Sequence, residues 1–284
     1  MRRDLGRARG LTLGVAWGAM AIGLVPLSAS AEGGTGHAYG HAWLGVAMAK
    51  NSGADGGVRV KHVIRGSPAD KAGLKEGDTL RAIDGTKVGS PEEVTRLVAA
   101  HDPGDSITAS VSHGPGVAAP VRVALAIRPS PDDMLRMDTI GAFAPAWVGV
   151  APIGDAPSSV NQLRGRVVLL DFWATWCGPC RVLAPKLSAL QARYGAQGLR
   201  VVGLTTDPAE SAATAAERLG IRYSIGVDGT AETSRAYDIS ALPTVFVIDK
   251  RGVVRDLVVG YDPSRDAQIE GLVKELLAEP APTD

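Results

Sequence analysis

The feature that most constrains the fold is an apolar run at residues 165–174 that leads directly into a helical pattern. The run GRVVLLDFWA is almost continuously apolar, as expected of a central strand that is covered on both faces of a sheet. The following CGPCRVLAPKLSALQARYG carries apolar residues at helical spacing from Val182 to Leu190 and ends near Gly195. Because such a strand needs helices around it, this segment predicts an α/β unit.

The rest of the second half alternates strands and helices. LRVVGLTTD predicts a second buried strand, and PAESAATAAERLG predicts a helix that opens at Asp207-Pro208. TVFVIDKRGVVRDLVVG predicts a β-hairpin that turns at residues 250–252, and SRDAQIEGLVKELLAE predicts a closing, capped helix. Together these elements predict a mixed sheet flanked by helices.

The first half has a different pattern, with short strands and two capped helices. WLGVAMA, GVRVKHVI and DTLRAIDG predict strands, and DSITASVS with VRVALAI predicts a hairpin. SPADKAGL and SPEEVTRLVAAHD predict helices that begin at Ser67 and Ser90. A chain of 284 residues is long enough for two domains, so this half predicts a small β-rich domain.

The N-terminus has the layout of a secretory signal. A basic start leads into an apolar run, Leu11–Leu27, and then into SASAEGG, which offers a cleavage site before Glu32. We expect a signal peptide at 1–31, a flexible lead-in at 32–40 and an exported protein, periplasmic or extracellular. The alternative is a retained membrane anchor, although the run is short for a span of about 20 residues.

Charge and histidines exclude several kinds of function. Lys plus Arg and Asp plus Glu both count 30, so no excess of positive charge points to nucleic acid. His37 and His41 lie four apart, but in a Gly-rich stretch that forms helices poorly, and we expect no metal site. No histidine follows His113, so the second half cannot supply a histidine-assisted nucleophile.

The two cysteines, Cys177 and Cys180, could form a structural disulfide, bind a metal or do chemistry. A disulfide that closes so short a loop gains only about 2 kcal/mol, against about 4.7 kcal/mol for a hundred-residue loop. Zinc needs about four ligands, and the sequence has no second cysteine pair. The start of a helix favours a thiolate, so we expect Cys177 to be a nucleophile and Cys180 to attack the resulting mixed disulfide.

Three stretches carry a resemblance to a known family: VVLLDFWATWCGPCRVLAPKL, IGAFAPAW with LRGRVV, and ALPTVFVID. With them, residues 140–278 resemble the thioredoxin superfamily, in its exported TlpA/ResA-like branch. The resemblance implies an α/β thioredoxin fold, a redox-active Cys177–Cys180 disulfide and no other cofactor. It also implies a cis peptide bond before Pro243, which lies opposite the active-site turn.

The resemblance also assigns the neighbours of the cysteines. Asp171 matches a buried carboxylate, whose pKa burial should raise, and which could accept the proton of Cys180; the alternative is a solvent-facing acid. The lysine that partners this acid in thioredoxin aligns with Gly203, and the branch often has Asn at the position of Asp171. Trp173 and Trp176 would form an apolar rim. The residues expected to bind substrate are Trp176, Gly178, Pro179, Leu242 and Pro243.

The segment WLGV followed by GSPADKAGLKEGDTLRAIDG and PEEVTRLV makes residues 41–128 resemble a PDZ domain of the bacterial, HtrA-associated kind. The resemblance implies a groove in which a peptide C-terminus adds as an extra strand. The alternative is that the apolar residues of this groove only fill the core. The residues expected to line the groove are Trp43, Leu44, Gly45, Val46, Val94, Leu97 and Val98.

These patterns predict an exported thiol-disulfide oxidoreductase with a PDZ domain, a linker at 129–139 and a polar tail at 279–284. We expect it to reduce protein disulfides with electrons from a DsbD/CcdA-like membrane protein. One alternative is an oxidase that forms disulfides. Another is a PDZ-based binding or chaperone protein in which the redox unit is secondary.

Overall fold

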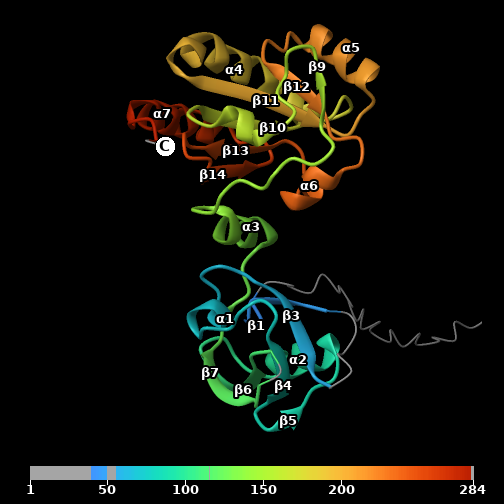
Figure 1. Cartoon of the computed structure of the whole chain (residues 1–284), viewed down its shortest axis with the longest axis vertical. Helices are drawn as coiled ribbons and strands as arrows, with labels where there is room; N and C mark the ends of the chain where they lie inside the picture. The colour runs from blue at the N-terminus through green and yellow to red at the C-terminus, as the bar shows by residue number, and fades with distance from the viewer. Residues whose placement is uncertain (1–39, 50–55, 115, 283–284) are drawn as a thin grey trace, which may run out of the picture. The chain divides into compact units, whose positions relative to one another are not determined.

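The computed structural model describes residues 40–49, 56–114 and 116–282 (Figure 1). The predicted signal peptide at 1–31 and nearly all of the lead-in at 32–40 lie outside these ranges. Across the described ranges, every helix is too short or too polar to cross a membrane.

The first half folds into a small β-rich domain with two helices. One sheet has the strand order β2-β3-β4-β6-β7, with β5 paired to β4, while β1 pairs with β8. Its strands are β1 (Ala42–Trp43), β2 (Val46–Met48), β3 (Val58–Val63), β4 (Thr79–Ile83), β5 (Thr86–Lys87), β6 (Ser106–Ser112), β7 (Ala119–Ala124) and β8 (Ala126–Ile127), and its helices are α1 (Pro68–Lys71) and α2 (Pro91–Ala99).

Both helices of this domain begin where the sequence predicts. The Ser67 hydroxyl accepts a hydrogen bond from the Asp70 N–H at 3.2 Å. Ser90 and Glu93 form a reciprocal capping box at the start of α2, which satisfies backbone donors that the helix leaves free. The buried Val94 and Val98 then join the domain core.

The predicted strand WLGVAMA is interrupted, because β1 and β2 are separated by Leu44 and Gly45. Gly45 has a φ of +88°, and a Cβ atom there would lie 2.2 Å from the Cβ of Ser67. Only glycine fits both this backbone conformation and this close approach. The break places Leu44 and Gly45 against the start of α1, where the Ala69 N–H donates to the Leu44 carbonyl.

The predicted linker contains a helix that the sequence analysis did not identify, α3 (Pro131–Thr139). Ser130 caps it by accepting a hydrogen bond from the Asp133 N–H at 3.1 Å. None of its residues is fully buried, in keeping with a connecting segment.

The second half has the predicted mixed sheet, with the order β14-β13-β10-β11-β12-β9. β10 is parallel to β11, and β11 to β12, while the other neighbours are antiparallel. The strands are β9 (Ala151–Ile153), β10 (Val167–Phe172), β11 (Leu199–Thr205), β12 (Ser224–Val227), β13 (Thr244–Ile248) and β14 (Val254–Val259), and the helices are α4 (Gly178–Tyr194), α5 (Ala209–Leu219), α6 (Glu232–Ala236) and α7 (Asp266–Ala278).

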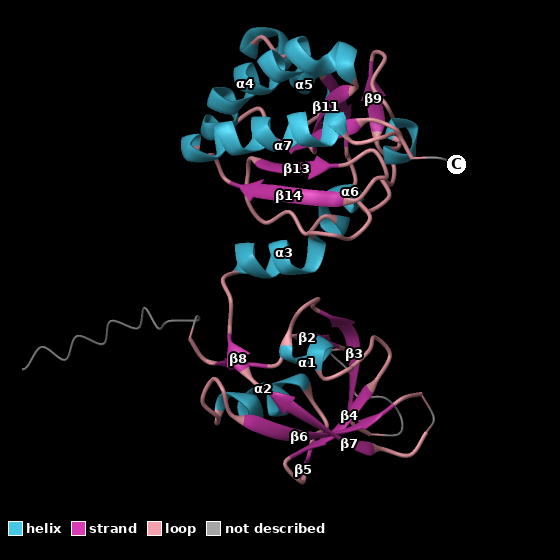
Figure 2. Cartoon of the chain, turned by 90° about the vertical axis from the view of Figure 1, so that its left-hand side faces the viewer, coloured by secondary structure: helices cyan, strands magenta, loops and turns pink. Residues whose placement is uncertain are grey.

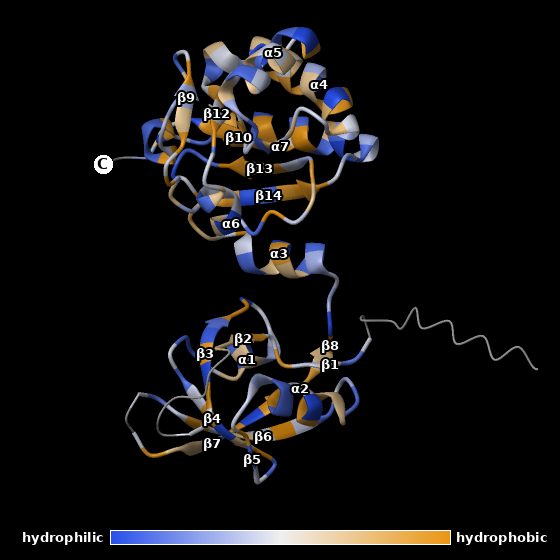
Figure 3. Ribbon diagram, turned by 90° about the vertical axis from the view of Figure 1, so that its right-hand side faces the viewer, coloured by the Kyte–Doolittle hydropathy of each residue, from blue (hydrophilic) through white to orange (hydrophobic). Residues whose placement is uncertain are grey.

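Two hydrophobic clusters cover the opposite faces of this sheet. Figure 2 shows the helices α4, α5 and α7 gathered beside its strands. Alternate residues of β10 point to opposite faces, so Val167 and Leu169 pack with α4, α5 and α7. Val168 and Leu170 pack on the other face, against residues of the 147–163 segment and the end of α6. Figure 3 shows the hydrophobic character of β10 and β13, which lie inside the sheet. Both faces of the central strand are therefore covered, as predicted.

The end of this domain differs in detail from the prediction. A short 3₁₀ turn, Pro263–Arg265, is capped by Asp262 and precedes α7, which has no side-chain cap of its own. Glu279, assigned to the tail by the sequence, forms an ion pair with Arg255 at 3.0 Å.

Candidate active site

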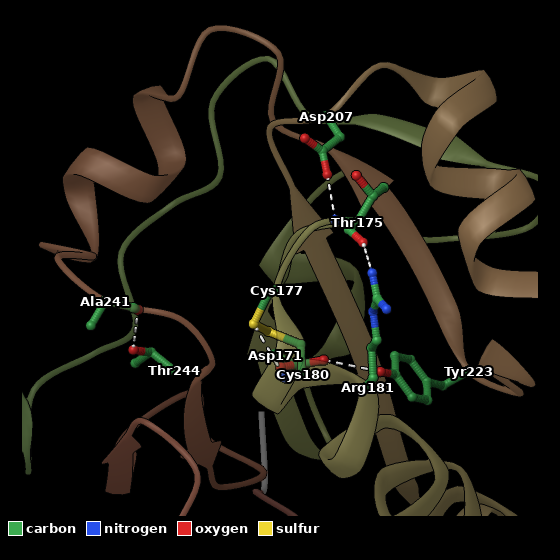
Figure 4. Close-up of a disulfide and its surroundings, with 9 residues drawn as sticks. All are labelled: Asp171, Thr175, Cys177, Cys180, Arg181, Asp207, Tyr223, Ala241 and Thr244. Atoms are coloured by element: carbon green, nitrogen blue, oxygen red, sulfur yellow. Dashed lines mark hydrogen bonds between the residues drawn. A yellow bond between two sulfur atoms is a disulfide. The ribbon is translucent and has the colours of Figure 1, made fainter. Parts of the chain in front are cut away.

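The two cysteines lie at the start of α4 and form a disulfide (Figure 4). Cys177 is the N-cap residue, and its sulfur accepts a hydrogen bond from the Cys180 N–H at 3.2 Å. Gly178 and Pro179 form the first turn, where proline removes no needed donor. Because the N-cap position favours an acceptor and negative charge, it is a position at which a helix would stabilise a thiolate on Cys177 once the disulfide is reduced.

Asp171 lies near the end of β10 with only 2% of its surface exposed. Desolvation raises the pKa of this carboxyl from 3.8 to about 7, and a hydrogen bond from the Tyr223 hydroxyl opposes the rise. The alternative of a solvent-facing acid is therefore wrong. A carboxyl with a pKa near neutrality can both accept and release a proton under physiological conditions.

The peptide bond between Leu242 and Pro243 is cis, as the resemblance implies. Pro243 immediately precedes β13, and its carbonyl accepts a hydrogen bond from the Gly260 N–H at 2.7 Å. The Thr244 hydroxyl donates to the Ala241 carbonyl at 2.9 Å, which closes the turn around this bond (Figure 4). Figure 4 draws Ala241 and Thr244 of this turn among the surroundings of the disulfide, and Leu242 packs against the hydrophobic cluster that includes both cysteines.

The two tryptophans have different environments. Trp176 is 71% exposed beside Cys177, as expected of a residue on a substrate-binding face. Trp173 is buried in the hydrophobic cluster that also holds both cysteines, so of the two tryptophans predicted to form an apolar rim, Trp176 is the exposed one. Because side chains alternate along a strand, Trp173 points to the same face of the sheet as Val167 and Leu169, the face covered by α4, α5 and α7. Trp176 lies in the loop that follows the strand.

Sequence reasoning missed a contact that fixes the loop before the disulfide. The Thr175 N–H donates to the Asp207 carboxylate at 2.6 Å, and Arg181 donates to the Thr175 carbonyl at 3.4 Å (Figure 4). The sequence analysis assigned Asp207 only to a helix start. No local pattern reveals this contact, because it joins residues 32 apart at the ends of two parallel strands.

The PDZ-like domain contains a cavity of about 320 Å³ between β2 and α2. β2 is an edge strand of its sheet within the described part of the chain. Leu97 packs against the core and does not line this cavity, and sequence reasoning missed Met48 and Arg128, which do. The predicted residues that line it are Trp43, Leu44, Gly45, Val46, Val94 and Val98.

The ranges that the structure describes contain no group of three or more His, Cys, Asp or Glu residues arranged to hold a metal ion. His41 lies within these ranges and lines the PDZ-like cavity, whereas His37 lies outside them.

Comparison with known proteins connects both halves to families. The AhpC/TSA family profile matches residues 140–257, and the PDZ domain profile matches residues 42–118. Thiol-disulfide oxidoreductase ResA of Geobacillus kaustophilus is 32% identical over 130 residues, covering 45% of this chain and 74% of that protein. ResA of Bacillus anthracis is 30% identical over 138 residues, covering 48% of this chain and 78% of that protein.

Among solved structures, a thiol:disulfide interchange protein of the thioredoxin family from Chlorobium tepidum is 29% identical, with a TM-score of 0.43. The match covers 50% of this chain and 99% of the Chlorobium tepidum chain.

The sheet, the cysteine pair at the start of α4 and the family matches define a thioredoxin-fold redox enzyme that also carries a PDZ domain. Within that class, the chain belongs to the ResA family of thiol-disulfide oxidoreductases.

Proposed function

We propose that this enzyme reduces disulfide bonds in exported proteins through Cys177 and Cys180. The observation that carries the proposal is the disulfide itself, which joins the N-cap of α4 to a residue one turn deeper. In that position the outer sulfur is stabilised as a thiolate and the inner sulfur can reach it, which is the arrangement that dithiol–disulfide exchange requires.

The proposed reaction has two steps. The Cys177 thiolate attacks one sulfur of a substrate disulfide, and the other substrate sulfur leaves as a thiolate. Cys180 then loses its proton to Asp171 and attacks Cys177, which releases the second substrate thiolate and forms the Cys177–Cys180 disulfide. The substrate gains two electrons and the enzyme dithiol loses them, so each cycle needs a new reductant.

The surface around the disulfide supports a polypeptide substrate. Trp176 offers an exposed apolar contact beside Cys177. The cis bond at Pro243 shapes the turn that lies among the surroundings of the disulfide (Figure 4), and Leu242 would pair its backbone with the substrate. Gly178 and Pro179 carry no bulky polar side chain that would keep a substrate away from Cys177.

Electron supply and location follow from the direction of the reaction. In an oxidising compartment, a reductase needs electrons from across the membrane, so we propose a DsbD/CcdA-like thiol donor as its partner. The signal-like residues 1–31 support export, with the retained anchor as the alternative.

The PDZ domain would bind the C-terminus of a client or partner. The open edge of β2 can accept an added strand, and the cavity between β2 and α2 can take a side chain. Holding a client there raises its effective concentration at the cysteines. The same groove also favours a second candidate function, in which capture of exposed C-termini is primary and the redox reaction is accessory.

Redox titration of the Cys177–Cys180 pair in the full chain tests the direction. A reductase should give a potential near the value of thioredoxin, about −270 mV. A potential near about −120 mV, the value of the strong oxidant DsbA, would instead make the enzyme an oxidase.

A further inference from the structure

The buried Asp171 has no cationic partner on the neighbouring strands. It lies opposite Gly203 on β11 and Val245 on β13. The residues of α5 and α7 in this layer are alanines and aliphatic side chains. The titratable side chain that contacts Asp171 directly is Tyr223 (Figure 4). The two cysteines of α4 and Tyr194 belong to the same hydrophobic layer.

Tyr223 comes from a different element, the segment that leads into β12, and is 8% exposed. Its hydroxyl donates a hydrogen bond to Oδ2 of Asp171 at 2.9 Å. Burial, together with the nearby carboxylate, raises the pKa of the phenol well above 10. The hydroxyl is therefore a neutral donor throughout the pH range in which Asp171 titrates.

Gly203 provides the space for this contact. A Cβ atom there would lie 2.9 Å from Nε1 of Trp173 and 3.1 Å from Cε2 of Tyr223. The two rings thus occupy the volume that a side chain at residue 203 would need. Tyr223 can contact Asp171 because residue 203 is a glycine, and a lysine at residue 203 would need the space that the tyrosine ring occupies.

The two oxygens of Asp171 are not equivalent. Oδ2 is held by Tyr223, whereas Oδ1 is buried and has no hydrogen-bond partner among the described residues. Buried polar atoms usually have a partner, so an unpaired oxygen needs an explanation. A role in proton transfer explains it, because a base must keep one oxygen free for the incoming proton.

We propose that Tyr223 is a positioning residue for proton transfer: it holds Oδ2 of Asp171, leaves Oδ1 free for the Cys180 proton, and reaches Asp171 because residue 203 is glycine. This proposal rests on the proposed function, in which Asp171 is the base of the second step. The proton moves from the Cys180 thiol to Oδ1, the Cys180 sulfur bonds to Cys177, and the substrate sulfur leaves with the electron pair of the broken bond.

Tyr223→Phe removes the hydroxyl and keeps the ring in place. In the wild type, the hydrogen bond from Tyr223 stabilises the ionised carboxylate of Asp171. Without this bond, the pKa of Asp171 should rise further from about 7. With less carboxylate available, the second step should be about tenfold slower at pH 6, while the rates of variant and wild type should converge at high pH.

The experiment uses the reduced full chain and a symmetric aromatic disulfide whose two coloured thiols are released in successive steps. Release of the second thiol, followed by stopped flow from pH 5 to pH 10, reports the attack by Cys180. Tyr237→Phe is the matched control, because Tyr237 is also buried but its hydroxyl contacts Pro145 and Trp147 on the other face of the sheet. This control should lower stability without moving the pH inflection.

Asp171→Asn separates failure of this proposal from failure of the proposed function. If Asp171→Asn abolishes the inflection and Tyr223→Phe leaves it in place, Asp171 is the base and Tyr223 is only structural, which overturns the proposal. If the inflection persists in Asp171→Asn, Asp171 is not the base, and the proton step of the proposed function fails as well.

Discussion

The Asp207 carboxylate accepts a hydrogen bond from the Thr175 N–H at 2.6 Å and so connects the end of β11 to the loop that carries Cys177. This contact fixes the entry to α4 independently of the disulfide. The backbone that leads into α4 should therefore keep its position when the disulfide is reduced.

Asp207→Ala should loosen this loop, because the Thr175 N–H loses its acceptor. Since both residues are only partly buried, we expect a loss of about 1 kcal/mol in the free energy of unfolding. In the reduced protein, the rate at which Cys177 reacts with an alkylating reagent should also change, and this rate can be measured as a function of pH. Asp207→Asn retains an oxygen acceptor and should restore most of both properties; equal behaviour of the two variants would contradict this role.

The buried carboxyl of Asp171 should make stability depend on pH. Its folded-state pKa of about 7 lies above the ordinary value of 3.8, so its contribution is fully favourable below pH 4 and is lost as pH rises through 7. The loss should amount to at most about 4 kcal/mol.

Denaturant unfolding of the oxidised enzyme at pH 4 and pH 8 measures this loss. Asp171→Asn cannot ionise, so its stability should fall less between these two pH values than that of the wild type. Parallel pH dependence in the two proteins would mean that the carboxyl is not desolvated as described.

The roles of the two cysteines can be tested by trapping. Cys180→Ala removes the attacking sulfur of the second step, so substrate proteins should remain attached to Cys177 as mixed disulfides. These adducts can be identified by non-reducing electrophoresis and mass spectrometry. Cys177→Ala should trap little, since Cys180 lies inside the first turn of α4 whereas Cys177 is at its N-cap; equal trapping would reverse the assignment.

Gly45 should be essential to the PDZ domain. Gly45→Ala would place a Cβ atom 2.2 Å from the Cβ of Ser67 at a φ of +88°, so we expect a cost of at least about 2 kcal/mol. Gly85→Ala is the matched control, because its φ is +78° but its Cβ atom would meet nothing within 4 Å. Denaturant unfolding of both variants should show the larger loss for Gly45.

The PDZ groove should recognise a free carboxylate. Peptides with an apolar C-terminal residue should bind the full chain, and amidation of that residue should abolish binding, as measured by calorimetry. If the groove also delivers clients to the cysteines, removing residues 41–128 should raise KM for a protein disulfide and leave a small disulfide unaffected. A similar rise for both substrates would contradict delivery.

The sequence predicted the features that depend on neighbouring residues. The caps at Ser67 and Ser90, the buried run of β10 and the cysteines at the start of a helix all follow from short-range spacing. The cis bond at Pro243 came from family resemblance, because sequence alone gives it a low frequency.

The features that were missed depend on contacts distant in sequence. Tyr223 reaches Asp171 across 52 residues, and Asp207 reaches Thr175 across 32. The residues next to Tyr223 and Asp207 in the sequence form no local pattern from which these distant partners could be predicted. Leu97 was assigned to the groove by the resemblance to PDZ domains, whereas in the structure it packs against the core and does not line the cavity.

The missing side chain at Gly203 also constrains how this protein can be altered. A lysine introduced there alone would collide with Trp173 and Tyr223, and shortening Tyr223 alone would leave Asp171 without a donor. The effects of the two exchanges should therefore be strongly non-additive, with the double variant less impaired than the sum of its parts. Grafting the lysine of thioredoxin onto this scaffold therefore requires changes at Trp173 and Tyr223 as well as at residue 203.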